Sequence, residues 1–160
     1  MLGRIFTVGG YTLLSRLTGF ARDIMLAAIL IEKLRIFEDE IVARNRVAER
    51  YARALGNVVT VPRLAPGCTS IWAQYTIRLP KGTDRDHFAA ALKAQGIPTT
   101  IYYVKSMHQQ TAYRDFPVAD GGVPVSESLS SDVISLPMHA YLDEATQDRI
   151  IAAVCDAVST

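Results

Sequence analysis

The spacing of apolar and polar residues changes character near residue 31. Before that point the chain is mostly apolar, and its charges are Arg4, Arg16, Arg22 and Asp23. Further on, apolar residues recur every three, four or seven positions, the spacing of one helix face. No Gly or Pro lies between Phe20 and Phe37. The pattern therefore predicts one long helix from about Phe20 to Leu55, which Gly56 and Asn57 would end.

The remaining residues alternate between strand and helix patterns. In the segment CTSIWAQYTIRLP, five apolar residues point to one side, which predicts a strand with one buried face: Ile71, Ala73, Tyr75, Ile77, Leu79. Thr83 is the predicted N-cap of the next helix. A second strand is predicted at Thr99–Val104, a short helix within 123–133, an extended segment at 134–138, and a last helix capped by Asp143.

This order of elements predicts an α/β protein of the α+β type, in which helices pack on a small, mostly antiparallel sheet. The formal net charge is +1 with acids and bases interspersed, which argues against nucleic acid as a partner. Cys68 and Cys155 form no C-x-x-C pair, and the three histidines lack metal-type spacing with carboxylates. We therefore expect no metal site.

The N-terminal residues show a second, different pattern. Their longest uncharged runs are Ile5–Ser15 and Ile24–Ile31, shorter than the ~20 apolar residues that cross a bilayer. The stretch TVGGYTLLSRLTGFARDIMLAAIL resembles the first transmembrane helix of the MurJ/MviN lipid II flippases. The resemblance implies that Arg16 and Arg22 match arginines that line a transport cavity. Because one helix cannot flip a lipid, an inert apolar leader is the favoured interpretation.

The larger part of the chain resembles another family. Four segments match, in order, the C-terminal part of the DegT/DnrJ/StrS sugar aminotransferases: LAAILIEKLRIFEDEIVARNRVAERYARAL, GCTSIWAQYTIRLP, LKAQGIPTTIYYVKSMHQQTAYRDF and ISLPMHAYLDEATQDRIIAAV. The resemblance implies the small C-terminal domain of a fold-type I enzyme. Such enzymes use pyridoxal 5′-phosphate to aminate keto groups of nucleotide-linked sugars. We expect residues 1–26 to form the flippase-like leader and residues 27–160 the aminotransferase domain.

The resemblance also implies a substrate-binding set, namely Tyr102, Tyr103 and His108. Tyr102 stands where many members have histidine, which resembles members that act on UDP-linked amino sugars. Two alternatives stay open: one of the tyrosines belongs to the core, and His108 caps residues 109–116 locally. The usual prolines are absent at Val104 and Ser106, which would loosen the segment between Tyr103 and His108.

Transamination needs a lysine that forms the aldimine and a carboxylate on the pyridine nitrogen. The family carries both in its large N-terminal domain. The four lysines after residue 30 lie outside the family's Schiff-base motif, and each is expected to be solvated: Lys33, Lys81, Lys93, Lys105. We therefore expect no catalytic and no cofactor-binding residue, and no activity of these residues by themselves.

Three alternatives to an aminotransferase fragment stay open. The chain could be a membrane-tethered module that associates weakly with a membrane through residues 1–26. It could be a binding module that forms a homodimer or pairs with an intact aminotransferase subunit. It could also be a remnant of a flippase reading frame. The expected location is the cytoplasm. If the leader associates with the membrane, the protein would lie at the inner face of the cell membrane.

Overall fold

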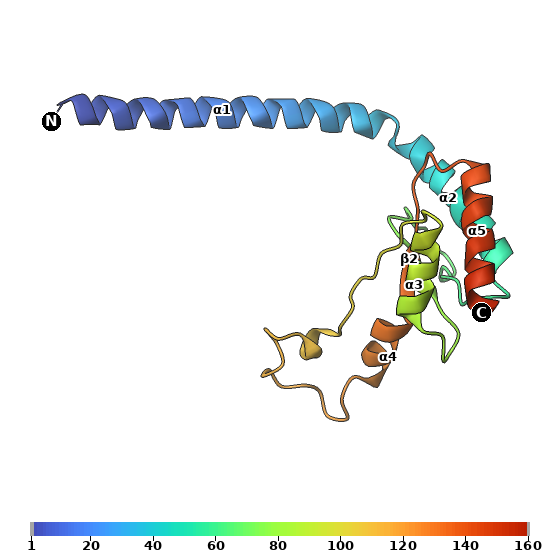
Figure 1. Cartoon of the computed structure of the whole chain (residues 1–160). Coiled ribbons are helices and arrows are strands. Elements are labelled where there is room, and N and C mark those ends of the chain that lie inside the picture. Colours follow the sequence, from blue (N-terminus) through green and yellow to red (C-terminus); the bar gives the residue numbers. More distant parts are fainter. Residues whose placement is uncertain (1, 160) are drawn as a thin grey trace. The chain divides into compact units, whose positions relative to one another are not determined.

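The computed structural model describes residues 2–159, with side chains from residue 15 onward. The chain divides into two compact units, Met1–Glu40 and Ile41–Thr160. The elements labelled in Figure 1 have the following bounds: α1 Leu2–Arg35, α2 Phe37–Leu55, β1 Tyr75–Arg78, α3 Arg85–Ala94, the 3₁₀ turn η1 Met107–Gln109, α4 Pro124–Asp132, β2 Val133–Leu136 and α5 Glu144–Ser159.

The predicted single helix from Phe20 to Leu55 is wrong at one position. The structure ends α1 at Arg35 and begins α2 at Phe37, and the N–H of Ile36 donates to the carbonyl of Lys33 in a tighter turn. Basic residues occupy the last turn of α1, and Glu38, Asp39 and Glu40 occupy the first turn of α2. These charges suit a helix C-terminus followed by a helix N-terminus. The break thus coincides with a change from basic to acidic residues and involves neither glycine nor proline.

In unit 1 the side chain of Lys33 is half exposed, which agrees with the expectation that it is solvated. Its ammonium group is paired with the carboxylate of Glu40, whose side chain is almost completely buried. By contrast, Leu17, Phe20 and Ile24 on α1 are more than half exposed. Among the described residues, no helix combines the length and the apolar character that crossing a bilayer requires.

Unit 2 is built on a two-stranded antiparallel sheet, in which Tyr75 pairs with Leu136 and Arg78 with Val133. The antiparallel direction agrees with the prediction, but the sheet is smaller. Single bridges extend it on both sides, from Thr60 to Arg78 and from Thr100 to Ser135. The predicted strand Thr99–Val104 therefore contributes a single bridge, at Thr100.

The first predicted strand is also shortened. Ile71 and Ala73 are exposed instead of buried, and regular pairing begins at Tyr75. Trp72 has a φ angle of 48°, which interrupts the extended backbone. Its indole N–H donates to Asn45, and its carbonyl accepts from Arg44. These two contacts tie α2 to the loop that precedes β1.

The core lies where α2, α3 and α5 cover the sheet. Its buried members come from every one of these elements: Val47, Ala48, Tyr51, Leu55, Val59, Tyr75, Ile77, Leu79, Phe88, Leu92, Ile97, Ile134, Leu136, Ile150, Ala153 and Val154. The rings of Tyr51 and Tyr75 meet with their centroids 5.0 Å apart. Burial raises the pKa of Tyr75 to about 12, so the phenol stays neutral. The core thus joins the predicted faces of the helices and the strand.

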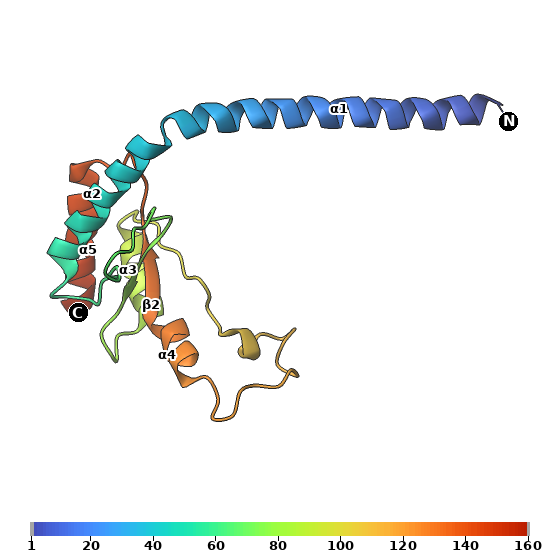
Figure 2. The ribbon, with the colours of Figure 1, turned by 180° about the vertical axis from the view of Figure 1, so that it is seen from behind.

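Helix α5 is fixed against α2, and Figures 1 and 2 show the two helices side by side from opposite directions. Arg50 on α2 pairs with Glu144 and Asp148 on α5. Beneath these ion pairs, the buried amide of Gln147 donates to the carbonyl of Val47 at 2.8 Å. A buried polar group with a partner avoids the cost of desolvation, so this bond helps to fix the packing of the two helices.

The caps of α3 and α5 lie close to the predicted positions. Asp84, and not Thr83, caps α3 by accepting from the N–H groups of Asp86 and His87. Asp143 caps α5 as predicted, accepting from the N–H and the hydroxyl of Thr146. The hydrogen bond from the backbone N–H, followed by that from the hydroxyl, lowers the pKa of Asp143 below the ordinary 3.8.

Deleting residues 1–24 should leave unit 2 folded and increase its solubility. All buried apolar residues of the core lie between Val47 and Val154, whereas Leu17, Phe20 and Ile24 expose apolar surface. Circular dichroism and thermal melting of the truncated chain, together with its solubility limit, measure this. A truncated chain that unfolds or aggregates more readily would contradict the expectation.

Replacing Asp143 with Ala should lower the melting temperature at neutral pH by about 3 °C. A carboxyl group with a lowered pKa stabilises the fold above its ordinary pKa, and this contribution is lost as the pH falls through the folded value. The gap between wild type and variant should therefore close below roughly pH 4. The control is Asp120→Ala in an exposed turn; a gap that persists in acid would contradict the capping role.

Candidate functional site

The candidate site is an open pocket between α4 and the segment that follows Thr100. Its volume is about 790 Å³. Figure 2 shows this segment leaving the sheet and returning to α4. The walls are formed by Tyr102, Tyr103, Lys105, Ser106, Met107, His108, Gln110, Tyr113, Phe116, Pro117, Val118, Ala119, Val123, Ser126, Leu129, Ser130 and Val133.

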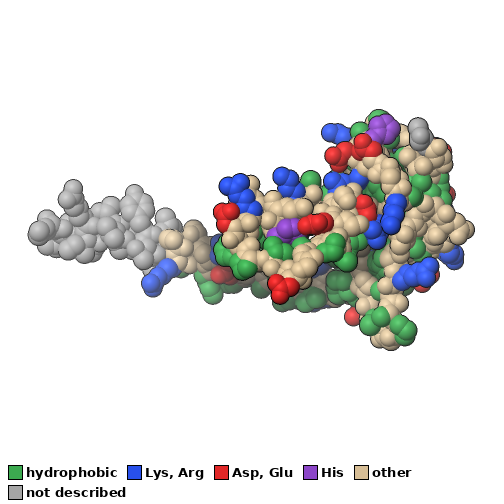
Figure 3. Space-filling view, turned by 90° about the horizontal axis from the view of Figure 1, so that it is seen from below, with side chains coloured by type: hydrophobic (Ala, Val, Ile, Leu, Met, Phe, Trp, Pro, Cys, Tyr) green, Lys and Arg blue, Asp and Glu red, His purple; other side chains and the backbone are tan. Residues whose placement is uncertain are grey.

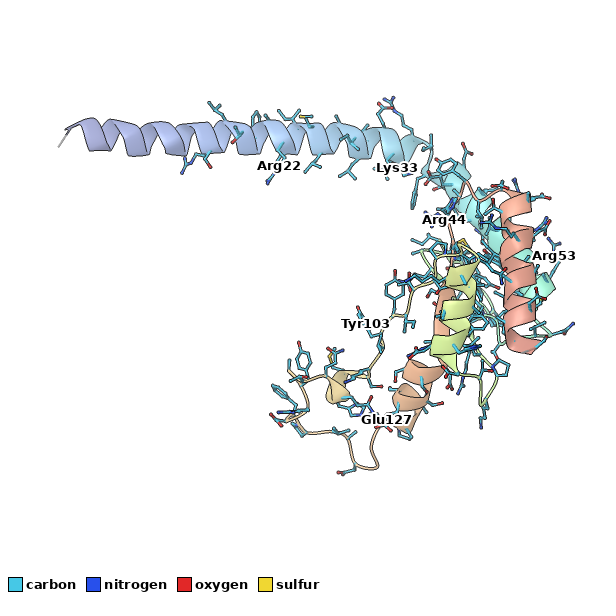
Figure 4. All side chains as sticks on the ribbon, viewed as in Figure 1. Arg22, Lys33, Arg44, Arg53, Tyr103 and Glu127 are labelled. Carbon is cyan, nitrogen blue, oxygen red and sulfur yellow. The ribbon has the colours of Figure 1, made fainter. Side chains whose placement is uncertain are left out.

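All three residues predicted to face the substrate line this pocket. Tyr102 and Tyr103 are 48% and 74% exposed, and their rings meet edge to face with centroids 6.5 Å apart. The alternative that one tyrosine belongs to the core is therefore wrong, because the predicted strand does not continue past Thr100. Figure 4 shows Tyr103 on the segment that leaves the sheet.

His108 is held by an element that the sequence analysis did not connect with it. It lies in η1, and its Nε2 atom is 2.8 Å from the carboxylate of Glu127 on α4. The alternative that His108 caps residues 109–116 is not what the structure shows, since its ring reaches α4 instead. The pair joins the two walls of the pocket.

Helix α4 is fixed at its C-terminal end by two arginines. Arg78 on β1 donates to Asp132 at 2.8 Å and to Ser128 at 2.9 Å. Arg85 donates to the carbonyl of Ser130, one of the carbonyls that a helix end leaves without an internal partner. The hydrogen bond from Arg78, followed by that from Ser128, lowers the pKa of Asp132 and keeps it ionised. These contacts place one wall of the pocket relative to the sheet.

The chemistry of the walls suits a ligand with apolar ring faces and hydroxyl groups. Tyr113, Phe116 and Leu129 supply apolar surface, and the tyrosine hydroxyls and the His108 ring supply polar groups. The hydroxyl of Ser106 is buried and has no hydrogen-bond partner within the described residues. Aromatic surface with a few polar groups is typical of a site that binds a small molecule.

The same residues do not fit pyridoxal phosphate. The cofactor needs a lysine for the aldimine and a carboxylate beside the pyridine nitrogen. Among the described residues that line the pocket, Lys105 is the one lysine, it is exposed, and no Asp or Glu is present. The described walls therefore lack the groups that would hold this cofactor.

A histidine outside the pocket has a structural partner. The Nδ1 atom of His139 accepts from the backbone N–H of Tyr141 at 3.2 Å. No cluster of metal-ligating side chains is present in the part of the chain that the structure describes. On the face drawn in Figure 3, Lys and Arg side chains are interspersed with Asp and Glu.

Comparison with known proteins identifies relatives of the chain. Residues 19–155 match the model of the DegT/DnrJ/EryC1/StrS aminotransferase family. A UDP-2-acetamido-2-deoxy-3-oxo-D-glucuronate aminotransferase of Pseudomonas aeruginosa is 39% identical over 133 residues, which are 82% of this chain and 35% of that protein. The match to the family model begins at residue 19, inside the segment predicted to be the leader. The boundary at residues 26–27 stays a prediction.

Solved structures agree with this assignment. A DegT DnrJ EryC1 StrS aminotransferase from Brucella abortus is 54% identical with a TM-score of 0.77, over 84% of this chain and 35% of the other. DesV of S. venezuelae, solved in complex with a ketimine intermediate, is 28% identical with a TM-score of 0.77, over 84% and 36%. The chain thus spans about a third of the length of these proteins. It belongs to the DegT/DnrJ/EryC1/StrS aminotransferase family.

Proposed function

We propose that residues 27–160 are the substrate-side domain of a nucleotide-sugar aminotransferase and that the pocket beside α4 contacts the sugar. The observation that carries the proposal is the convergence of Tyr102, Tyr103 and His108 on one pocket. The family uses pyridoxal phosphate, and its members include proteins that transaminate UDP- and dTDP-linked sugars. The proposed substrate is a UDP-linked keto sugar, the class named for the Pseudomonas relative.

The walls support a binding role in three ways. The two tyrosine rings offer faces and hydroxyl groups to a sugar ring, which has both apolar C–H and polar O–H surface. His108 adds a nitrogen that can bond a hydroxyl group. The neighbouring Tyr113 and Phe116, whose ring centroids are 6.1 Å apart, add aromatic surface to the pocket walls.

The proposal assigns no bond-making chemistry to the 160 residues. Lys81, Lys93 and Lys105 are exposed, and Lys33 is paired with Glu40. A lysine that forms an aldimine must lose its proton, which solvated or ion-paired amines resist at neutral pH. We therefore propose that these residues alone do not transaminate, and that an intact subunit supplies the reacting lysine.

The origin of the N-terminal segment is the subject of a separate proposal. We propose that residues 1–26 derive from a flippase-like sequence joined to the aminotransferase domain, on the strength of the TLLSRLTGFARD motif. Long reads of genomic DNA across codons 20–35, taken from an independent clone, provide the test. Two separate genes in place of one continuous frame would overturn the fusion.

The chain should not form a stoichiometric Schiff base with pyridoxal phosphate. Incubation with the cofactor, borohydride reduction and peptide mass spectrometry would reveal a stable adduct on any of the lysines. The expected result is sparse labelling spread over the exposed lysines, as in an unrelated lysine-containing control protein. Full occupancy of one lysine would contradict the proposal.

The pocket should bind UDP-N-acetylglucosamine, used here as the probe. Replacing Tyr103 or His108 with Ala should weaken binding about fivefold each, the effect of one lost hydrogen bond. Titration followed by NMR chemical shifts measures the dissociation constants. Tyr141→Ala is the matched control, because this exposed tyrosine lies outside the pocket. Equal affinity of all variants, or no binding by the wild type, would count against the proposed site.

A further inference from the structure

Glu127 is the one side chain that hydrogen-bonds the pocket segment to another element of the described structure. The pocket segment comprises residues 102–122. Its backbone hydrogen bonds are local: the N–H of Gln110 donates to Met107, and that of Phe116 donates to Tyr113. The ion pair between Arg114 and Asp115 is also local. The contact of His108 with Glu127 is different, because it spans 19 positions of the sequence and reaches α4.

The geometry of this pair indicates which tautomer of the neutral ring suits the contact. An ionised carboxylate accepts hydrogen bonds and donates none. The Nε2 atom of His108 at 2.8 Å must therefore carry the proton. In the neutral ring this leaves Nδ1 as an acceptor. Within the described residues no hydrogen bond to Nδ1 of His108 is found, and His108 lines the pocket.

Glu127 is held in place by the contacts of its own helix, α4. Helix α4 is nine residues long, too short to be stable without tertiary contacts. Its C-terminal end is held by Arg78 through Asp132 and Ser128, and by Arg85 through the carbonyl of Ser130. Figure 4 shows Glu127 on this helix. The carboxylate thus projects from an element anchored to the sheet, whereas His108 belongs to a segment without such anchors.

We propose that Glu127 is a positioning residue for the sugar site: it holds His108 in the Nε2–H form and ties residues 102–122 to α4, so that Nδ1 accepts a hydrogen bond from a ligand hydroxyl. This inference depends on the proposed function only for the identity of the ligand. A carboxylate that orients the far nitrogen of a histidine is a common way to fix the nitrogen that does the binding.

The test is the tautomer of His108, observed by long-range ¹H–¹⁵N correlation at mildly alkaline pH, where imidazoles are neutral. The chain has three histidines, and His108→Asn assigns the signal. Wild type should show the Nε2–H form alone. Glu127→Ala should give a mixture of tautomers, and Glu127→Gln should restore the wild-type form because its amide oxygen still accepts. His139 serves as an internal reference, since its Nδ1 accepts from Tyr141.

Amide hydrogen exchange measures the tie to α4. In Glu127→Ala, amide exchange across residues 107–116 should accelerate roughly two- to fivefold. This is the change expected when one partly exposed ion pair no longer stabilises the segment. Exchange at Ile77 and Ile134 in the sheet should not change. Glu49→Ala, an exposed glutamate on α2, is the matched control. A folded Glu127→Ala chain with the wild-type tautomer and unchanged exchange would overturn the inference.

These two readouts need no ligand, so they separate this inference from the proposed function. Addition of UDP-N-acetylglucosamine should then shift the Nδ1 resonance of His108 in wild type and in Glu127→Gln. If the tautomers of the variants change as expected but the probe causes no shift, the proposed sugar site is contradicted and the positioning role of Glu127 is still supported.

Discussion

The antiparallel pairing of Tyr75–Arg78 with Val133–Leu136 is the constraint on which the rest of unit 2 depends. It joins segments more than fifty residues apart in the sequence, and such a closure is stable only if the paired faces are buried. Tyr75, Ile77, Ile134 and Leu136 provide that burial beneath α2, α3 and α5. Because a slip of one residue would turn these side chains outward, the core fixes the register.

The register in turn sets the position of the pocket. It places Arg78 opposite Val133, next to the residue that ends α4, so that Arg78 reaches Asp132 and Ser128. A negative charge at a helix C-terminus is unfavourable by itself, and Arg78 offsets it. From there the chain of contacts runs along α4 to Glu127 and across to His108. His108 is thus connected to the sheet through four side chains, namely Arg78, Asp132, Ser128 and Glu127.

The features predicted from the sequence are those with a local or periodic signal. The cap at Asp143 and the α4 pattern within 123–133 both have one. The break at Ile36 also has a local signal, in the basic residues before it and the acidic ones after it, but the continuous apolar spacing favoured one helix and the prediction missed the break. The partner of His108 has none, because the contact with Glu127 arises only after the sheet register brings α4 to the pocket. The resemblance pointed to Tyr102, Tyr103 and His108; it could not supply Glu127, Tyr113 or Phe116.

The structure separates stability from recognition. The buried core contains none of the residues proposed to face the sugar, and Tyr103 is three-quarters exposed. Replacing such a residue removes little buried apolar surface, so its effect falls on binding and not on unfolding. The reverse holds for Tyr51 and Tyr75, whose rings pack against each other inside the core. A pocket wall that is tied to the core by a few charged contacts can therefore vary in sequence, and with it the ligand, while the fold beneath it stays the same.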